Sequence, residues 1–224
     1  MTIDIEGNTD KRILRVFVVR HGQTDHNVKK IVQGHLDSEL NDVGRLQASK
    51  VGGLLSTIKV DDLISSDLKR CANTMDYIKT HHPDIPVRYT ENLRERNMGP
   101  AEGMYLQDAI DKFGVNFRNL GETNQDLVKR VELEWKKIIK MNQNSLNIVL
   151  CSHGGAITSF INSLYRDHNF HLHENLSPND LKIPFNTSIA VIDVLKETSH
   201  GTIQAFGNTS HLGGHYEVEL QNLV

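Results

Sequence analysis

Residues 13–22, ILRVFVVRHG, join a short apolar run to a polar turn. The run is rich in β-branched side chains, which predicts a buried strand over residues 13–19. The strand is expected to stop at Arg20, His21 and Gly22. The glycine lets the backbone turn sharply or approach a ligand closely. The sequence therefore places an arginine and a histidine at the end of a buried strand.

The same pattern, an apolar run followed directly by a polar turn, recurs twice further along the chain. Residues 60–64 lead into SSDLKR at 65–70, and residues 147–151 lead into SHGG at 152–155. Further strands are expected at 87–89, 187–194 and 203–206, and helices at 42–58, 68–80, 123–141 and 156–165. Strands that alternate with helices predict an α/β fold, a three-layer α/β/α sandwich with a largely parallel central sheet.

One domain over residues 1–224 is the simplest organisation, because no repeat, linker or low-complexity block interrupts the pattern. Residues 1–11 are polar and acidic and are expected to form a loose N-terminal arm. Residues 23–41 carry Gly, Asn and Asp and are expected to be loop. The apolar residues of 93–122 have weak periodicity, which indicates loop and short helix. We expect this segment to form a lid over a site.

The composition excludes several classes of function. The net charge of −3 and the 6% aromatic content argue against a protein that binds nucleic acid. No stretch approaches the roughly 20 apolar residues of a membrane helix. Two distant cysteines, Cys71 and Cys151, do not make a disulfide framework and are expected to be packing residues. We expect a cytoplasmic protein, with the nucleus also open.

The polar clusters should meet, because ligands bind beyond the carboxyl ends of parallel strands. A crevice that holds Arg20, Arg70, His21 and His153 suits a dianion such as phosphate, which arginine forks match in geometry. The positive charges favour the neutral form of His21, and a neutral imidazole can attack phosphorus. Glu95, on the loop after the third strand, would supply the proton for the leaving oxygen. This set needs no metal.

Four motifs, in this order along the chain, resemble the histidine phosphatase superfamily, also called phosphoglycerate-mutase-like. They are RHGQTDHN at 20–27, SSDLKR at 65–70, LRERNMG at 93–99 and SHGG at 152–155. The resemblance spans residues 13–212. Segments at 34–44, 121–131, 185–188 and 207–214 are similar to fungal broad-specificity phosphatases of this family.

The resemblance implies a role for each residue. His21 would be the phosphorylated nucleophile, and Glu95 the proton donor that later activates water. Arg20, Arg70 and His153 would hold the phosphoryl oxygens. Asn27 and Gly154 would complete the substrate-binding set. The resemblance also implies that no metal or organic cofactor is needed, that the substrate is a small phosphomonoester, and that a homodimer is open as an assembly.

Three other functions stay open from the sequence. A phosphoglycerate mutase of this family usually carries an ERHYG-like segment and an adjacent pair of arginines, whereas Asn97 and Met98 stand here in place of His-Tyr and no adjacent arginine pair occurs. We therefore favour a phosphatase. A module that docks a phosphorylated partner without turnover is the second alternative. A metallohydrolase that uses the histidines of residues 167–174 is the third, although a surface loop is the simpler interpretation of that segment.

Two further side chains are ambiguous. Glu95 lies between two arginines in a run that is typical of a solvated face, and Glu102 in the same loop could replace it as the acid. His211 could form a hydrogen bond inside the site or simply pack.

Overall fold

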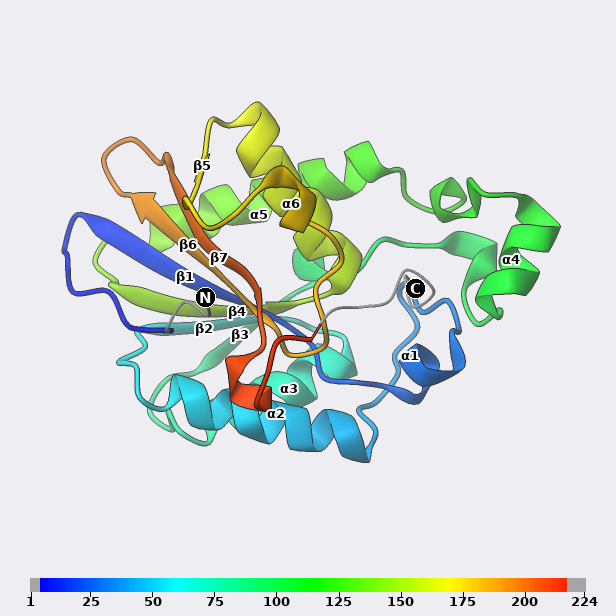
Figure 1. Ribbon diagram of the computed structural model, residues 1–224, viewed down its shortest axis with the longest axis horizontal. Coiled ribbons are helices and arrows are strands. Elements are labelled where there is room, and N and C mark those ends of the chain that lie inside the picture. Colours follow the sequence, from blue (N-terminus) through cyan, green and yellow to red (C-terminus); the bar gives the residue numbers. More distant parts are fainter. Residues whose placement is uncertain (1–4, 217–224) are drawn as a thin grey trace.

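A computed structural model describes residues 5–216. Its strands are β1 (Ile13–Arg20), β2 (Asp62–Ser66), β3 (Val87–Thr90), β4 (Asn147–Ser152), β5 (His171–Leu172), β6 (Ile189–Leu195) and β7 (Gly201–Asn208). They form one seven-stranded sheet in the order β3-β2-β4-β1-β6-β7-β5 (Figure 1).

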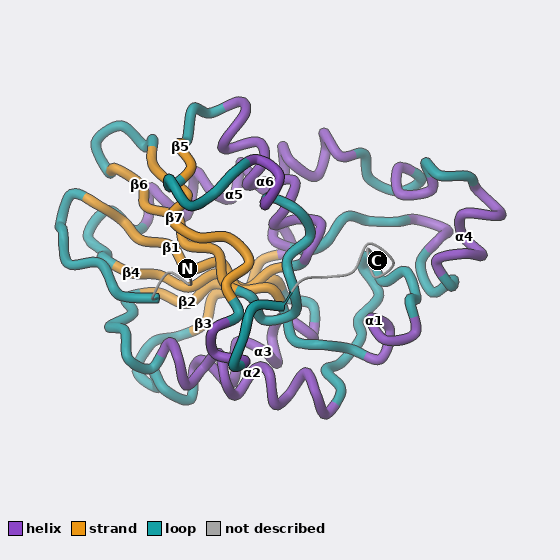
Figure 2. The backbone as a smooth tube through the Cα atoms, in the orientation of Figure 1, coloured by secondary structure: helices purple, strands orange, loops and turns teal. Residues whose placement is uncertain are grey.

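The helices lie on both faces of this sheet, as the sequence predicts. They are α1 (Asp25–Lys29), α2 (Asp42–Leu55), α3 (Lys69–Lys79), α4 (Leu106–Phe113), α5 (Asn124–Met141) and α6 (Gly154–Asp167). Short 3₁₀ turns are η1 (Glu91–Leu93), η2 (Gly99–Ala101), η3 (Phe117–Asn119), η4 (Pro178–Asp180) and η5 (Ser210–Leu212). Helices α2 and α3 cover one face, and α5 and α6 cover the other (Figures 1 and 2). The α/β/α sandwich is therefore confirmed.

The sheet is mixed, with its parallel part in one half. Strands β3, β2, β4 and β1 run parallel, whereas β6 is antiparallel to both β1 and β7, and β5 runs parallel to β7. The antiparallel pairing of β6 with β7 follows from chain length, since only residues 196–200 join these two strands. A parallel crossover needs a dozen or more residues, so a short connection of this kind closes a hairpin.

Strand β1 is buried on both faces, which explains its unbroken apolar run. Phe17 and Val19 belong to the core beneath α2 and α3, and Val16 and Val18 belong to the core beneath α5 and α6. This alternation is the period of two that a strand imposes. Both cysteines are fully buried in the α2–α3 core, in agreement with their expected packing role.

The segment between β3 and α5 has a small core of its own beside the main body. Ala101, Ala109 and Phe117 are buried there together with Val32 from the loop after α1, and they hold α4 together with the neighbouring turns. The segment projects past the carboxyl ends of the parallel strands, in the direction of α1 (Figure 1). No helix of residues 5–216 is long and apolar enough to cross a membrane.

One short helix, α1, lies where the sequence predicted only loop. Thr24 caps it, because its hydroxyl accepts from Asn27 N at 3.1 Å while the Asn27 side chain accepts from Thr24 N at 3.1 Å. This reciprocal pair is a capping box with Asn in the position usually filled by Glu or Gln. The helix is five residues long, too short for an apolar period to reveal it.

The expected loose arm is also wrong for its described part. Ile5 is buried in the α2–α3 core. The amide of Asn8 donates to Asn147 Oδ1 at 2.6 Å, and the Asn147 side chain donates back to the Asn8 carbonyl at 3.1 Å. These contacts tie the start of the chain to β4. Residues 1–4 lie outside the described part.

Candidate active site

Two imidazoles meet at the carboxyl ends of β1 and β4. The parallel register pairs Arg20 with Ser152, so the next residues, His21 and His153, leave the sheet side by side. Their ring centroids lie 5.3 Å apart with 56° between the ring planes, and both side chains are buried. The His21 amide also donates to the Ser152 carbonyl at 3.0 Å. The sheet register therefore brings together two histidines that are 132 positions apart (153 − 21).

The protonation state of His21 follows from its neighbour. Its Nδ1 lies 2.7 Å from the Gly22 carbonyl oxygen. A carbonyl oxygen only accepts, so Nδ1 carries the proton and Nε2 keeps its lone pair. Burial, then the charges of Arg70 and Arg20, lower the pKa of His21 well below its ordinary value of 6.5. The result is a neutral imidazole whose Nε2 can act as a nucleophile.

Arg70 lies in the first turn of α3 and is 1% exposed. Its Nη1 donates to the Leu36 carbonyl at 2.6 Å and its Nη2 to the Gly34 carbonyl at 2.8 Å. Its Nε donates to Nδ1 of His153 at 3.1 Å. Each Nη carries two protons, so one proton on each remains for a ligand. Arg70 is thus held by three protein acceptors and still offers donors to the site.

His153 is engaged on both ring nitrogens. Because Nδ1 accepts from Arg70, Nε2 carries the proton and donates to Ser66 Oγ at 2.9 Å. Burial, followed by the charges of Arg70, His21 and Arg20, lowers the pKa of His153 well below 6.5. In this arrangement His153 orients Arg70 and packs against the ring of His21.

Arg20 carries a donor with no protein partner. Its Nη1 donates to the Pro184 carbonyl at 2.7 Å, but its buried Nε has no hydrogen-bond partner. Burial lowers the pKa of Arg20 to about 10, with a further lowering by the charge of Arg70. A buried, unpaired donor on a cation is costly in free energy. An anionic ligand beside Arg20 and Arg70 would offset that cost.

Glu95 faces the start of α6 from the loop after η1. Its Oε2 accepts from the Gly155 amide at 2.8 Å, and its Oε1 accepts from the Arg96 amide at 2.9 Å. A carboxylate is favourable at a helix N-terminus, where amide N–H groups lack helical partners. The carboxyl group is therefore held at the same edge of the sheet as His21.

The two glycines at the start of α6 leave room for this arrangement. A Cβ on Gly154 would lie 3.2 Å from Cζ and Nε of Arg20. A Cβ on Gly155 would lie 2.6 Å from Oε1 of Glu95. A side chain at position 155 would therefore displace the carboxyl group.

A cavity of about 150 Å³ lies over these residues. Five of the seven residues predicted for the site line it: Arg20, His21, Arg70, Glu95 and Gly154. Its walls also include side chains that the sequence did not single out individually, namely Val32, Gln33, Arg96, Met98, Phe117, Arg118, Thr158, Ser159 and Ile183. Four of them, Arg96, Met98, Phe117 and Arg118, lie in the segment 93–122 that was expected to cover a site. Most of these come from irregular segments, for which no sequence period gives a signal.

The other two predicted residues do not line the cavity. His153 instead contacts Arg70, whose Nε donates to its Nδ1. Asn27 completes the capping box of α1, and its Oδ1 lies 3.4 Å from Nδ2 of Asn186, which also donates to the His21 carbonyl at 3.0 Å. Asn27 thus reaches the site only through Asn186 in this structure.

The two ambiguous side chains belong to supporting contacts. Oε1 of Glu102 accepts from the amides of His35 and Met98, each at 2.9 Å, and Glu102 does not line the cavity. Nε2 of His211 contacts Thr187 Oγ1 at 3.1 Å, while its buried Nδ1 has no partner. The Thr187 amide in turn donates to the Arg20 carbonyl at 3.1 Å. His211 therefore contacts the segment that holds the end of β1, outside the cavity.

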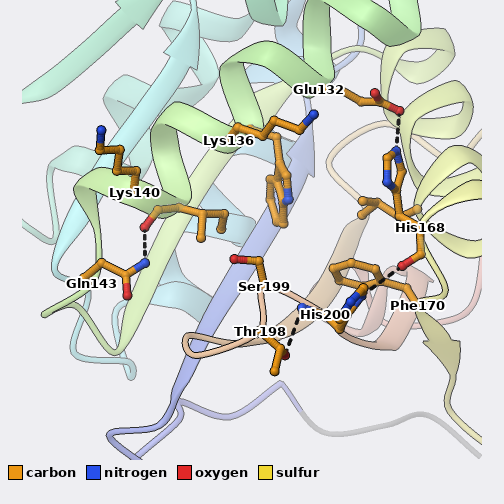
Figure 3. Close-up of a pocket in the computed structure, with 12 residues that line it drawn as sticks. Glu132, Lys136, Lys140, Gln143, His168, Phe170, Thr198, Ser199 and His200 are labelled. Carbon is orange, nitrogen blue, oxygen red and sulfur yellow. Dashed lines mark hydrogen bonds and ion pairs between the residues drawn. The ribbon is translucent and has the colours of Figure 1, made fainter.

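A larger cavity, of about 460 Å³, lies at the opposite end of the sheet. Figure 3 shows the residues that line it. It is lined by the second half of α5 and by the turn between β6 and β7. Its histidines have structural partners: His168 Nε2 pairs with Glu132 at 2.8 Å, and His200 Nδ1 donates to the His168 carbonyl at 3.2 Å. Within residues 5–216 no cluster of three or more His, Cys, Asp or Glu side chains could hold a metal ion.

The geometry defines a class: an α/β sandwich with a neutral histidine and two buried arginines at the carboxyl edge of its parallel strands. The family model of the histidine phosphatase superfamily (branch 1) matches residues 16–205. The chain belongs to this superfamily.

Individual relatives agree with this assignment. The chain is 41% identical over 217 residues to a broad-specificity phosphatase of Saccharomyces cerevisiae, covering 92% of this chain and 90% of the relative. It is 36% identical over 204 residues to a probable phosphatase of Schizosaccharomyces pombe, covering 89% and 95%. A solved phosphoglycerate mutase of Bacillus anthracis shares the fold with a TM-score of 0.76 at 22% identity, covering 93% of this chain and 97% of that one.

Proposed function

We propose that this chain is a phosphoric monoester hydrolase that works through a phosphohistidine on His21. One observation carries the proposal: Nε2 of a neutral His21 keeps its lone pair, in a cavity that is lined by two buried arginines. The similarity to two fungal phosphatases, over about nine-tenths of the chain, supports hydrolysis as the overall reaction.

The first step transfers the phosphoryl group to the protein. Nε2 of His21 attacks phosphorus as the ester P–O bond breaks, and protonated Glu95 gives its proton to the leaving oxygen, so an alcohol departs. Arg20 and Arg70 bind the phosphoryl oxygens, where negative charge is concentrated. His153 keeps Arg70 in place through Nδ1.

The second step returns the protein to its starting state. The carboxylate of Glu95 takes a proton from water, and the oxygen of that water attacks phosphorus. The P–N bond to His21 breaks, inorganic phosphate leaves, and Glu95 is protonated again. One phosphomonoester and one water are consumed, and one alcohol and one phosphate are produced.

Small phosphomonoesters are the substrates we propose. The cavity is small, its walls mix apolar side chains such as Met98, Phe117 and Ile183 with the cations of Arg96 and Arg118, and no single recognition element dominates them. Such a wall tolerates different leaving groups, in keeping with the broad specificity named for the yeast relative. We further propose a cytoplasmic or nuclear location, which suits two free buried thiols. The homodimer stays a prediction.

Turnover of a panel of phosphate esters tests the proposal. The purified chain should release phosphate from 4-nitrophenyl phosphate and from sugar phosphates, and His21→Ala should abolish release. His171→Ala, a change at an exposed histidine outside the cavity, is the control and should keep full activity. Interconversion of 3- and 2-phosphoglycerate faster than hydrolysis would instead establish a mutase. Tight phosphopeptide binding without turnover would establish a docking module.

A further inference from the structure

Glu95 lies in a loop, yet its proposed role as proton donor demands a fixed position. Residues 94–98 form no helix or strand. Among the residues that the structure describes, the carboxyl group itself accepts hydrogen bonds from the amides of Gly155 and Arg96. A group on an irregular loop stays in place only if other residues hold the loop backbone.

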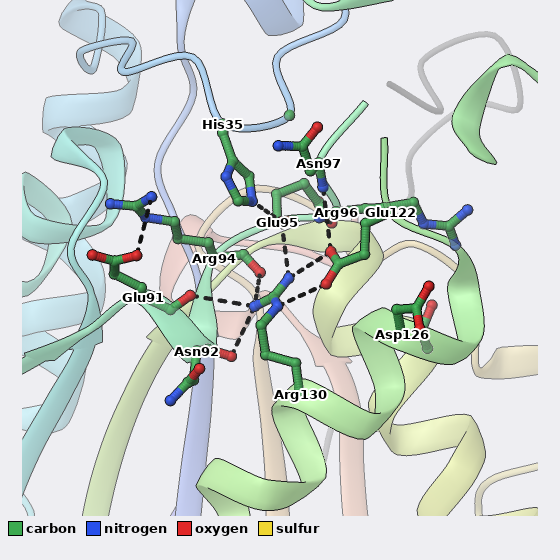
Figure 4. Close-up of polar contacts among 12 residues, drawn as sticks. His35, Glu91, Asn92, Arg94, Glu95, Arg96, Asn97, Glu122, Asp126 and Arg130 are labelled. Carbon is green, nitrogen blue, oxygen red and sulfur yellow. Dashed lines mark hydrogen bonds and ion pairs between the residues drawn. The ribbon is translucent and has the colours of Figure 1, made fainter. Parts of the chain in front are cut away.

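Arg130, on α5, is the residue that holds this backbone (Figure 4). Its Nη1 donates to the carbonyls of Asn92 at 2.9 Å, Arg94 at 3.2 Å and Glu91 at 3.3 Å. Its Nη2 donates to the carbonyl of Glu95 itself at 3.2 Å. One guanidinium thus binds four carbonyls of the segment that ends at the proposed acid.

Glu122 binds both Arg130 and the loop. It accepts from Nε of Arg130 at 2.8 Å and from Nη2 at 2.7 Å, a bidentate pair. Its amide donates to the Asn97 carbonyl at 2.8 Å, and its Oε2 accepts from the Asn97 amide at 3.3 Å. The Arg130–Glu122 pair therefore forms hydrogen bonds with the loop backbone on both sides of Glu95. Neither Arg130 nor Glu122 lines the cavity.

We infer that the Arg130–Glu122 pair is a positioning device for Glu95, and that it sets how well the enzyme cleaves esters with poor leaving groups. The inference rests on the proposed function. A poor leaving group needs a proton as the P–O bond breaks, whereas a good one departs as a stable anion. A displaced Glu95 therefore slows alkyl and phenyl esters much more than dinitrophenyl esters. The pair lies outside the cavity and acts only through the loop.

The experiment measures kcat/KM for 2,4-dinitrophenyl, 4-nitrophenyl, phenyl and methyl phosphates with Arg130→Met and Glu122→Gln. kcat/KM reports only the first, phosphoryl-transfer step. We expect about 10- to 100-fold loss for phenyl and methyl phosphate and less than about twofold loss for the dinitrophenyl ester. Arg130→Lys keeps the charge without the fork and should show the same trend.

A matched control comes from another bidentate pair. Arg15 and Asp193 join with distances of 2.7 Å, and their side chains are 22% and 10% exposed, against 20% and 15% for Arg130 and Glu122. They lie on β1 and β6, outside the cavity. Arg15→Met should lower the melting temperature without changing the dependence on leaving group. The same flat dependence in Arg130→Met would overturn the inference.

Glu95→Gln separates this inference from the proposed function. It should show the steep dependence on leaving group, and Arg130→Met in that background should steepen it no further, because both changes remove one function. A flat dependence in Glu95→Gln would refute the role of Glu95 as acid. A steep dependence on leaving group in Glu95→Gln, together with a flat dependence in Arg130→Met, would refute only the positioning role of the Arg130–Glu122 pair.

Discussion

Nε of Arg70 donates to Nδ1 of His153 at 3.1 Å, and this bond couples the second histidine to the arginine that lines the cavity. It fixes the tautomer of His153 and turns its Nε2–H toward Ser66. The bond also leaves His153 as a neutral imidazole, so that no third cation lies against the ring of His21. The site thus combines two buried guanidiniums with two uncharged histidines.

Arg70→Lys should lower kcat/KM for 4-nitrophenyl phosphate by about 100- to 1000-fold, as loss of one preorganised donor does in other sites. Lysine offers a single point of donation and cannot reach the Leu36, Gly34 and His153 acceptors together. Steady-state kinetics provide the measurement. Arg88→Lys, at an ion pair with Asp62 outside the cavity, is the control and should change kcat/KM by less than about twofold. Equal losses of kcat/KM in both variants would contradict the proposal that Arg70 binds the phosphoryl oxygens.

Gly155→Ala should move the carboxyl group of Glu95, because the new Cβ would lie 2.6 Å from Oε1. We expect about tenfold loss of kcat/KM for phenyl phosphate, a partial loss of the roughly 100- to 10,000-fold that general acid catalysis contributes. Gly53→Ala is the matched control: it also lies in a helix, and nothing lies within 4 Å of its added Cβ. That control should keep full activity and gain about 0.5–1 kcal/mol of stability. Unchanged activity in Gly155→Ala would place the acid elsewhere.

His21 should be the neutral Nδ1–H tautomer at pH 6.5 and should remain neutral below it. Burial and the nearby arginines lower its pKa, and the Gly22 carbonyl selects the tautomer. A long-range ¹H–¹⁵N correlation spectrum of the ¹⁵N-histidine-labelled protein reads both properties, with His21→Asn to assign the signal. An imidazolium at pH 6.5, or a proton on Nε2, would be incompatible with the proposed nucleophile.

His211 should make stability depend on pH. Burial, then Lys50, lowers its pKa to about 4, so the unfolded chain binds more protons between that value and 6.5. Its contribution is fully present above pH 6.5 and is lost as pH falls toward 4, by about 2–4 kcal/mol. Urea unfolding of wild type and His211→Gln over pH 4–7 measures the difference. Wild type should lose that much more stability than the variant on acidification. Parallel pH curves would show that His211 does not contribute.

The sequence predicted the central part of this fold because strand ends carry strong local signals. Buried runs such as residues 13–19 lie between polar turns, and parallel strands carry their ends to one edge. Arg20, His21, Arg70 and Glu95 therefore meet as expected. The bounds of β2 differ by two residues, since residues 60–61 precede the ladder.

Contacts between distant, irregular segments could not be predicted in this way. Asn8 finds Asn147 across 139 residues, and no local pattern encodes that pairing. Phe117 and Met98 reach the cavity because the segment around α4 folds onto its own small core. Arg130 lies on a helix among other charged residues, where a solvated position is the ordinary interpretation. Only the carbonyls that surround it in three dimensions show its task.

The central claim is that the phosphoryl group passes through His21. The direct measurement is mass spectrometry of the protein quenched in alkali, which preserves phosphohistidine, during turnover of 2,4-dinitrophenyl phosphate. One phosphoryl group should be found on the peptide that contains His21, with none in His21→Ala and a normal amount in His171→Ala. Phosphate release at a normal rate from His21→Ala, or a phosphoryl group on another residue, would contradict the account.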